Sequence, residues 1–294
     1  TAATPKLTGT AKARVAAVGR LLGVDADGPV YFNYNVQAGY DNAPALQYPG
    51  GYAESVTVPV SALARIPEEL SFAEAAPMGC AGVTTFHALR TTKAVAGERV
   101  AVLGIGGLGH LGVQFARAMG FETIAVARGA GKAEDAYELG AHHYVDSTAG
   151  DVGAALKALG GVSVVLATAA SSQAMADTVG GLLPRGELVT IGVSAEPLPI
   201  SPLQLITPSL SIIGHPSGTA RDVEETMKFA VQSGVRARIE EVPLARAAEA
   251  YAAMAEGLVL YPHFYAHVVP GWFDKSLRWR TARACWIWSS TSAA

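Results

Sequence analysis

Three glycines at a fixed spacing are the residues of this sequence that most directly predict chemistry. Gly104, Gly106 and Gly109 form a G-x-G-x-x-G pattern. The apolar run 99–103 before them predicts a buried strand, and residues 108–119 after them have the apolar periodicity of a helix. Such glycines allow a tight turn, let the backbone approach a pyrophosphate, and let the helix pack closely on the sheet. The pattern therefore predicts a dinucleotide site at the N-terminus of that helix.

The end of the next predicted strand, 123–126, indicates which dinucleotide is bound. Sites that select NAD carry an Asp or Glu about 20 residues after the glycines, where the carboxylate accepts a hydrogen bond from the ribose 2′-OH. This sequence has Ala127 at that point, followed by Arg128 and Lys132. Two cations without a carboxylate suit the 2′-phosphate of NADP, so we expect NADP to be preferred and NAD to be possible. The alternative is that both cations are simply solvated at the surface.

Composition and charge exclude several classes of function. Half of the 294 residues are hydrophobic, and the net charge of −3 offers no basic surface for nucleic acid. No apolar run approaches the 18 residues of a membrane span, so we expect no membrane partner. Two cysteines, Cys80 and Cys285, are too few for a disulfide framework, which favours a reducing, cytoplasmic compartment. The first 24 residues carry four basic and no acidic side chains, so a transit peptide is the alternative.

The order of the predicted elements changes along the chain. Residues 1–82 have short strands, at 30–34 and 52–58, and a brief helix at 71–76. From 83 to 222 strands alternate with helices, which predicts the α/β class with a doubly wound parallel sheet. The strands predicted there are 99–103, 123–126, 143–145, 162–167, 187–191 and 211–214. Helices are predicted to follow at 222–233 and 245–256.

The last part of the chain, 258–294, does not share this pattern. It contains all four tryptophans and shows no clear amphipathic period. We therefore predict a divergent tail, and a partner-binding aromatic segment is the alternative. A truncated or frameshifted reading of a gene is a further explanation for altered ends around an intact central region.

Short motifs upstream of the glycines match a known family. Residues 50–54 read Gly-Gly-Tyr-Ala-Glu, and 80–84 read Cys-Ala-Gly-Val-Thr, which begins 24 residues before Gly104. With these motifs and the approach to them at 66–77, the chain resembles the zinc-type medium-chain alcohol dehydrogenases over about residues 50–257.

That resemblance implies a Rossmann domain inserted in a GroES-like, β-rich catalytic domain. The implied division is 1–82 for a partial GroES-like domain, 83–222 for the Rossmann domain, 223–257 for the return to the catalytic domain and 258–294 for the tail. It also implies a small-molecule alcohol or aldehyde as substrate. A homodimer or homotetramer is expected, with the edge strand near 210–214 pairing the sheets of two copies.

The resemblance further implies roles for particular residues. Cys80 is expected to be a ligand of the catalytic zinc, and Thr84 is expected to contact the nicotinamide. The remaining expected cofactor residues belong to the glycine turn, the two cations, and the loops after the fourth and fifth Rossmann strands. They are Gly104, Gly106, Gly107, Leu108, Gly109, Arg128, Lys132, Thr168, Ala169, Ile191, Gly192 and Val193.

The zinc ligands are the point at which this sequence departs from the family. The family takes its other zinc ligands from upstream, as a Cys and a His or a His–Glu pair, whereas residues 1–79 contain no cysteine and no histidine. A catalytic zinc takes three protein ligands, which Cys80 alone does not supply. The leading hypothesis is an NADP-preferring alcohol dehydrogenase for primary or aromatic alcohols and aldehydes, whose activity in this chain depends on the missing ligands. The alternatives are a zinc-independent quinone or enone reductase and a catalytically inactive NADP-binding protein.

Overall fold

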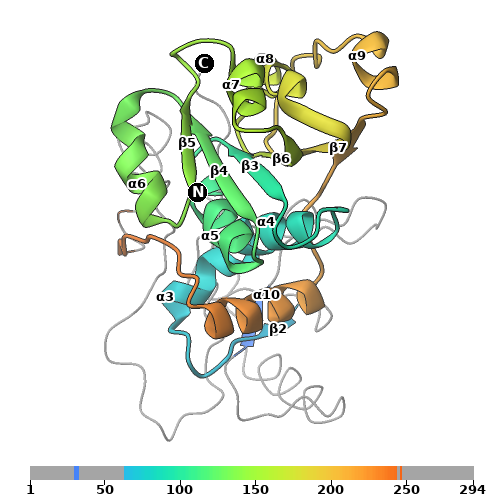
Figure 1. The fold of residues 1–294 in the computed structure, drawn as a ribbon. Coiled ribbons are helices and arrows are strands. Elements are labelled where there is room, and N and C mark those ends of the chain that lie inside the picture. Colours follow the sequence, from blue (N-terminus) through green and yellow to red (C-terminus); the bar gives the residue numbers. More distant parts are fainter. Residues whose placement is uncertain (1–29, 33–62, 244–245, 247–294) are drawn as a thin grey trace, which may run out of the picture.

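A six-stranded parallel sheet forms the centre of the computed structural model, which describes residues 30–32, 63–243 and 246 (Figure 1). Its order is β5-β4-β3-β6-β7-β8, the order of a doubly wound nucleotide-binding sheet, with the reversal between β3 and β6. The predicted α/β class is confirmed. The strands are β3 (Arg99–Leu103), β4 (Glu122–Ala127), β5 (His143–Asp146), β6 (Val162–Ala167), β7 (Leu182–Thr190) and β8 (Ser211–Gly214).

Helices cover both faces of this sheet, which explains why its strands are apolar on both sides. Alternate residues of β3 point to opposite faces, so Val100 and Val102 belong to one buried cluster, whereas Ala101 and Leu103 belong to another. The first cluster includes residues of α4 (Ala81–Arg90), α5 (Gly109–Ala118), α6 (Ala133–Glu138) and α10 (Ala220–Ser233). The second includes residues of α7 (Val152–Ala158) and α8 (Ser172–Asp177). The short helix α9 (Pro202–Ile206) precedes β8.

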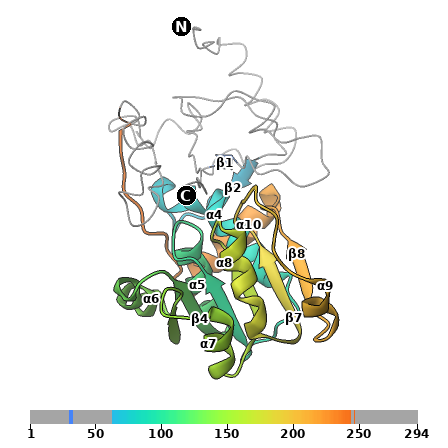
Figure 2. The ribbon, with the colours of Figure 1, turned by 90° about the horizontal axis from the view of Figure 1, so that it is seen from above.

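The described residues before α4 form small elements at one end of the sheet. Strand β1 (Val30–Phe32) pairs in antiparallel fashion with β2 (Leu63–Arg65). Helix α3 (Phe72–Ala75) begins with a capping box between Ser71 and Glu74 and continues into the turn η2 (Ala76–Gly79). Helix α10 lies beside both strand β2 and helix α4 in both views (Figure 2).

Most predicted strands occur where the apolar runs placed them, and two results differ. Strand β7 begins at Leu182 rather than at 187, because its first residues include a Pro and a Gly that hide the strand pattern. Strand β2 was not predicted, because three residues are too few to show a period. The expected strand at 52–58, the helix at 245–256 and the tail lie outside the described residues. No described helix is long and apolar enough to cross a membrane.

Two of the three predicted domain boundaries fall inside helices, and the third, after residue 257, lies outside the described residues. The boundary after residue 82 lies within α4, and the boundary after residue 222 lies within α10. These two helices pack against each other, so the ends of the predicted Rossmann segment meet in space. The division into domains stays a prediction.

Candidate functional site

The glycine turn lies at the carboxyl end of β3, in the place where the strand order of the sheet reverses. Gly104 has a φ of +92°, a conformation that residues with a Cβ rarely adopt. Its N–H donates to Val126 on β4, at 2.8 Å. On the other side, the Thr168 hydroxyl lies 2.9 Å from the carbonyl oxygen of Leu103 and 3.0 Å from that of Gly104. Thr168 therefore ties the turn to the end of β6, and the turn lies at the reversal of strand order, which is where dinucleotides bind in such sheets.

The glycines of this turn differ in the space around them. A Cβ added to Gly106 would meet nothing within 4 Å, so a ligand has room to approach the backbone there. A Cβ on Gly109 would lie 1.8 Å from the carbonyl oxygen of Gly104. That Cβ would also lie 3.0 Å from the Thr168 hydroxyl, so Gly109 lets the start of α5 pack closely on the carboxyl ends of β3 and β6. Gly112 allows a second close approach to the sheet, where a Cβ would lie 3.1 Å from Leu166.

The N-terminus of α5 faces this turn. Gly107 follows Gly106 in the turn, and Leu108, which is 7% exposed, is the N-cap residue of the helix. The cap has no side-chain hydrogen bond, and the N–H groups of His110 and Leu111 donate to the carbonyls of Gly106 and Leu108 at 2.9 and 3.1 Å. An anion at this end would therefore meet the N–H groups that precede His110, together with the helix dipole.

Two further predicted loops meet beside the turn. Gly192, after β7, approaches the loop after β6 so closely that a Cβ would lie 2.1 Å from the carbonyl oxygen of Ala169. The N–H groups of Ile191 and Gly192 donate to Ala167 at 3.0 and 2.9 Å. Val193 is 69% exposed. The structure thus brings the glycine turn and both loops to one edge of the sheet.

The two predicted cations lie at the end of β4. The Arg128 side chain is exposed, and the partly buried Lys132 places Nζ 3.4 Å from the carbonyl oxygen of Ile105 in the glycine turn. Burial lowers the pKa of Lys132, and the positive charge of Arg128 lowers it further. A bound anion would relieve this repulsion, so the pair is suited to a phosphate.

Two residues that the sequence did not single out hold the loop of Arg128. The carboxylate of Asp146 accepts a hydrogen bond from the N–H of Gly129 at 2.7 Å, and the Tyr144 hydroxyl donates to the carbonyl of Gly129 at 2.6 Å. A hydrogen bond from the backbone of Thr148 is the main cause that lowers the pKa of Asp146. The sequence signal that could have identified Asp146 is its position directly after an apolar strand pattern. The carboxyl ends of parallel strands share one edge of the sheet, so a carboxylate there lies near the loop of Arg128.

Cys80 and Thr84 lie at the start of α4. Burial raises the pKa of the Cys80 thiol to about 11, so the thiol is protonated at neutral pH. Thr84 is 7% exposed, and its hydroxyl donates to the hydroxyl of Ser217 at 3.0 Å. Among the residues that the structure describes, no three His, Cys, Asp or Glu side chains gather as a metal site. The described part of the chain therefore does not fit a catalytic zinc, and we derive no step through that metal.

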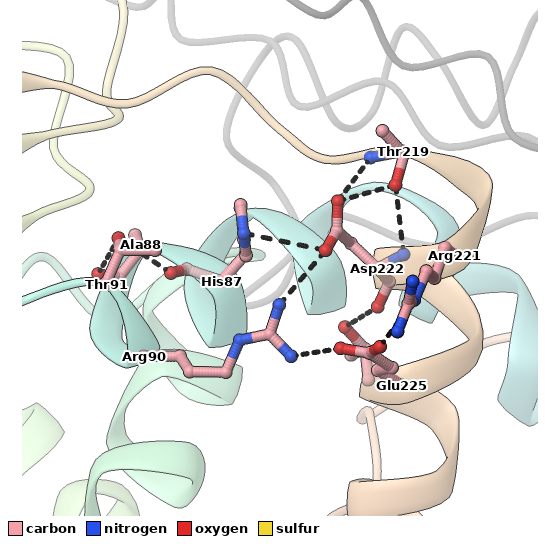
Figure 3. Close-up of polar contacts among 9 residues, drawn as sticks. His87, Ala88, Arg90, Thr91, Thr219, Arg221, Asp222 and Glu225 are labelled. Atoms are coloured by element: carbon pink, nitrogen blue, oxygen red, sulfur yellow. Dashed lines mark hydrogen bonds and ion pairs between the residues drawn. The ribbon is translucent and has the colours of Figure 1, made fainter.

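A charged cluster joins α4 to α10 and positions the helix that carries Thr84 (Figure 3). Asp222 accepts from Arg90 at 3.0 Å and lies 3.5 Å from Nε2 of His87, while Arg90 also pairs with Glu225. Burial raises the pKa of Asp222, but hydrogen bonds from Thr219 and the nearby positive charges outweigh it, so the net pKa is lowered. His87 is thus a helix residue packed between α4 and α10.

Comparison with known proteins shows which family this chain resembles. Residues 107–232 match the family model described as zinc-binding dehydrogenase. The chain is 38% identical over 212 residues to alcohol dehydrogenase notN of an Aspergillus species, covering 72% of this chain and 62% of that protein. It is 38% identical to an alcohol dehydrogenase of Geobacillus stearothermophilus (71% and 63%) and 33% identical to the NADP-dependent alcohol dehydrogenase C of Mycobacterium bovis (71% and 59%). The chain thus spans about three fifths of the length of these relatives.

Solved structures agree with this result. The alcohol dehydrogenase of Aeropyrum pernix superposes with a TM-score of 0.71 at 26% identity, covering 80% of this chain and 74% of that one. The cinnamyl alcohol dehydrogenase of Sorghum bicolor superposes with a TM-score of 0.63 at 29% identity, covering 69% and 58%. These neighbours bear out the predicted fold class of a Rossmann sheet within a GroES-like architecture. Over the matched residues the chain is therefore similar to the zinc-binding dehydrogenases and to medium-chain alcohol dehydrogenases.

Proposed function

We propose that this chain binds NADP(H) and serves hydride transfer between the cofactor and a small alcohol or aldehyde. The observation that carries the proposal is the glycine turn at the reversal point of the sheet, with Lys132 in contact with Ile105 inside it. The name of the relative from Mycobacterium bovis, which is NADP-dependent, supports the choice of cofactor.

Three groups of described residues would bind three different parts of the cofactor. The N-terminus of α5 and the turn around Gly106 would hold the pyrophosphate, and Arg128 with Lys132 would hold the 2′-phosphate. Thr84, Thr168 and the loop 191–193 would lie toward the nicotinamide. Bound NADP would supply the hydride acceptor, its nicotinamide C4, for an alcohol carbon that loses the hydride while the hydroxyl loses its proton, which would convert the alcohol to an aldehyde.

The substrate we propose is a primary or aromatic alcohol, or the corresponding aldehyde. The relation to the cinnamyl alcohol dehydrogenase of Sorghum bicolor, whose name states an aromatic primary alcohol, supports this class. We also propose that two copies pair along β8, which is the edge strand of the described sheet, since Ile212 and Ile213 are each 37% exposed there. Sedimentation analysis of the whole chain tests this pairing, and a monomer at micromolar concentration would refute it.

A second function is favoured because Cys80 has no further zinc ligands beside it in the part of the chain that the structure describes. Cys80 is the one cysteine in the described residues and gathers no metal site there. An NADPH-dependent quinone or enone reductase of the same superfamily needs no metal. Zinc content per chain, measured together with enone reduction, separates the two enzymes. About one zinc with alcohol oxidation supports the first function, whereas enone reduction without zinc supports the second. Nucleotide binding with neither activity indicates an inactive NADP-binding protein.

The cofactor proposal is tested by titrating NADPH and NADH into the chain and into an Arg128→Ala/Lys132→Ala variant. We expect the variant to lose at least tenfold in NADPH affinity, about 1.4 kcal/mol, with NADH affinity nearly unchanged. Arg221→Ala is the matched control, because it removes an 87% exposed cation on α10. Equal losses for both nucleotides would refute the assignment of the 2′-phosphate.

A further inference from the structure

One buried imidazole touches the glycine turn from inside the protein. His110 lies in the first turn of α5, and its side chain is fully buried. Its Nδ1 lies 3.0 Å from the carbonyl oxygen of Gly106, and its Nε2 lies 3.1 Å from the backbone nitrogen of Arg238. The ring therefore stands between the turn and the segment 236–238, which is 128 residues away along the chain from His110.

These two contacts decide where the ring carries its proton. A backbone N–H always donates, so Nε2 must accept from Arg238 and has no proton of its own. The neutral ring then carries its proton on Nδ1, which donates to Gly106. Burial lowers the pKa of His110 to about 4, which agrees with a neutral ring.

The contact with Gly106 orients the next peptide group. The carbonyl of Gly106 also accepts from the backbone N–H of His110 at 2.9 Å, so two donors hold it in the direction of the helix. In a trans peptide the C=O and the following N–H point in opposite directions. Holding the Gly106 carbonyl along the helix therefore turns the N–H of Gly107 the opposite way, toward the N-terminal end of the helix.

The segment that holds the ring is itself firmly held. Gln114, one helical turn after His110, donates to the carbonyl of Arg236 at 2.9 Å and accepts from its N–H at 3.2 Å. The guanidinium of Arg238 pairs with Asp135 and Glu138 of α6, each at 2.7 Å. The acceptor state of Nε2 is thus maintained by a segment bound to both α5 and α6.

We propose that His110 is a positioning residue for the cofactor, whose Nδ1–H sets the Gly107 N–H toward the pyrophosphate. The inference rests on the proposed function, since it concerns the same nucleotide site. His110 acts through the backbone of the turn and does not touch the ligand.

Two substitutions separate this role from a merely structural one. His110→Asn keeps a donor at the position of Nδ1 but does not reach Arg238, whereas His110→Gln places an acceptor near Nε2 and loses the donor to Gly106. Each variant loses one buried hydrogen bond, so we expect similar losses of stability. We expect NADPH affinity to fall about tenfold in the Gln variant and to stay near the original value in the Asn variant.

Two controls locate the effect. Adenosine 2′-monophosphate contains no pyrophosphate, so its affinity should be the same for the unaltered chain and for both variants. Thr178→Val removes a buried hydrogen bond, from the Thr178 hydroxyl to the carbonyl of Met175, that involves neither the turn nor the segment 236–238, and it should leave NADPH affinity unchanged.

The outcomes distinguish the two proposals. A chain that does not bind NADPH overturns the proposed function and this inference with it. If the chain binds NADPH, two results overturn this inference alone. One is an NADPH affinity of the Gln variant equal to that of the unaltered chain, and the other is an equal loss of NADPH affinity in the Asn and Gln variants. If the Gln variant does not fold, ¹⁵N chemical shifts of His110 in the unaltered chain decide at neutral pH. A proton on Nδ1 supports the inference, and a proton on Nε2 overturns it.

Discussion

Acid should destabilise this protein through His110, because the buried ring cannot accept a second proton without losing a hydrogen bond. A proton on Nε2 would face the backbone N–H of Arg238 across 3.1 Å, so two donors would oppose each other. No solvent reaches the ring to compensate, since its side chain is 0% exposed. The structure therefore disfavours the charged ring.

The size of the effect follows from the two pKa values. Burial lowers the pKa of folded His110 from 6.5 to about 4, whereas the unfolded chain titrates near 6.5. Between these values the unfolded state binds more protons, so the free energy of unfolding falls as the pH falls. The loss begins as the pH falls through 6.5, reaches roughly 3 kcal/mol at pH 4 and levels off at roughly 3.4 kcal/mol about one pH unit lower. Domains of this kind have a total stability of about 5–15 kcal/mol, so this loss is large.

Urea unfolding followed by far-UV circular dichroism measures this loss from pH 7.5 to pH 4.5. The reference is His110→Asn, which does not titrate but keeps every other ionisable group. At neutral pH the free energy of unfolding should be lower for the variant than for the unaltered chain. The difference between these two free energies should narrow by about 1.4 kcal/mol per pH unit below pH 6.5. Equal m-values would show that both proteins unfold from the same folded state. Two stability profiles that stay parallel down to pH 4.5 would refute the reasoning.

Three further substitutions test the turn and the cluster between α4 and α10. Gly106→Val should leave the fold intact but weaken NADPH binding, because a Cβ there meets nothing within 4 Å; unaltered affinity in a folded variant would show that the turn is not the cofactor site. Gly109→Ala should lower the free energy of unfolding by about 1–3 kcal/mol, since its Cβ would lie 1.8 Å from a backbone oxygen. Gly131→Ala is the control, because a Cβ there meets nothing within 4 Å and should leave the free energy of unfolding unchanged. Equal urea midpoints for the two variants would contradict this expectation. Asp222→Asn should cost about 1–2 kcal/mol by weakening the hydrogen bonds to α4, whereas Arg221→Ala should leave the thermal midpoint nearly unchanged. Equal shifts in the two midpoints would contradict that reading.

The parts of the fold that depend on residues close together in the sequence were predictable from the sequence. The strands at 99–103, 162–167 and 211–214 have the limits that their apolar runs predicted. The glycine spacing predicted the turn, because strand-to-helix turns of this kind need a positive φ at the position of Gly104 and a missing Cβ at that of Gly109.

The contacts that complete the candidate site could not be predicted in the same way. Thr84 meets Ser217 across 133 residues, and His110 meets Arg238 across 128. Neither partner belongs to a motif, and a hydrogen bond between distant residues leaves no period in a single sequence. The roles of Tyr144 and Asp146 also depend on β5 lying beside β4, which is a property of the sheet.

The sequence by itself determined the class of the fold, the glycine turn and the cations beside it, because local steric and apolar patterns specify these features. The tertiary structure alone decided that Gly112 permits the close packing of α5 on the sheet, that Lys132 reaches the glycine turn, and that the ring of His110 is neutral. These properties depend on which groups meet after folding. Burial and hydrogen-bond direction exist only once distant segments are packed together.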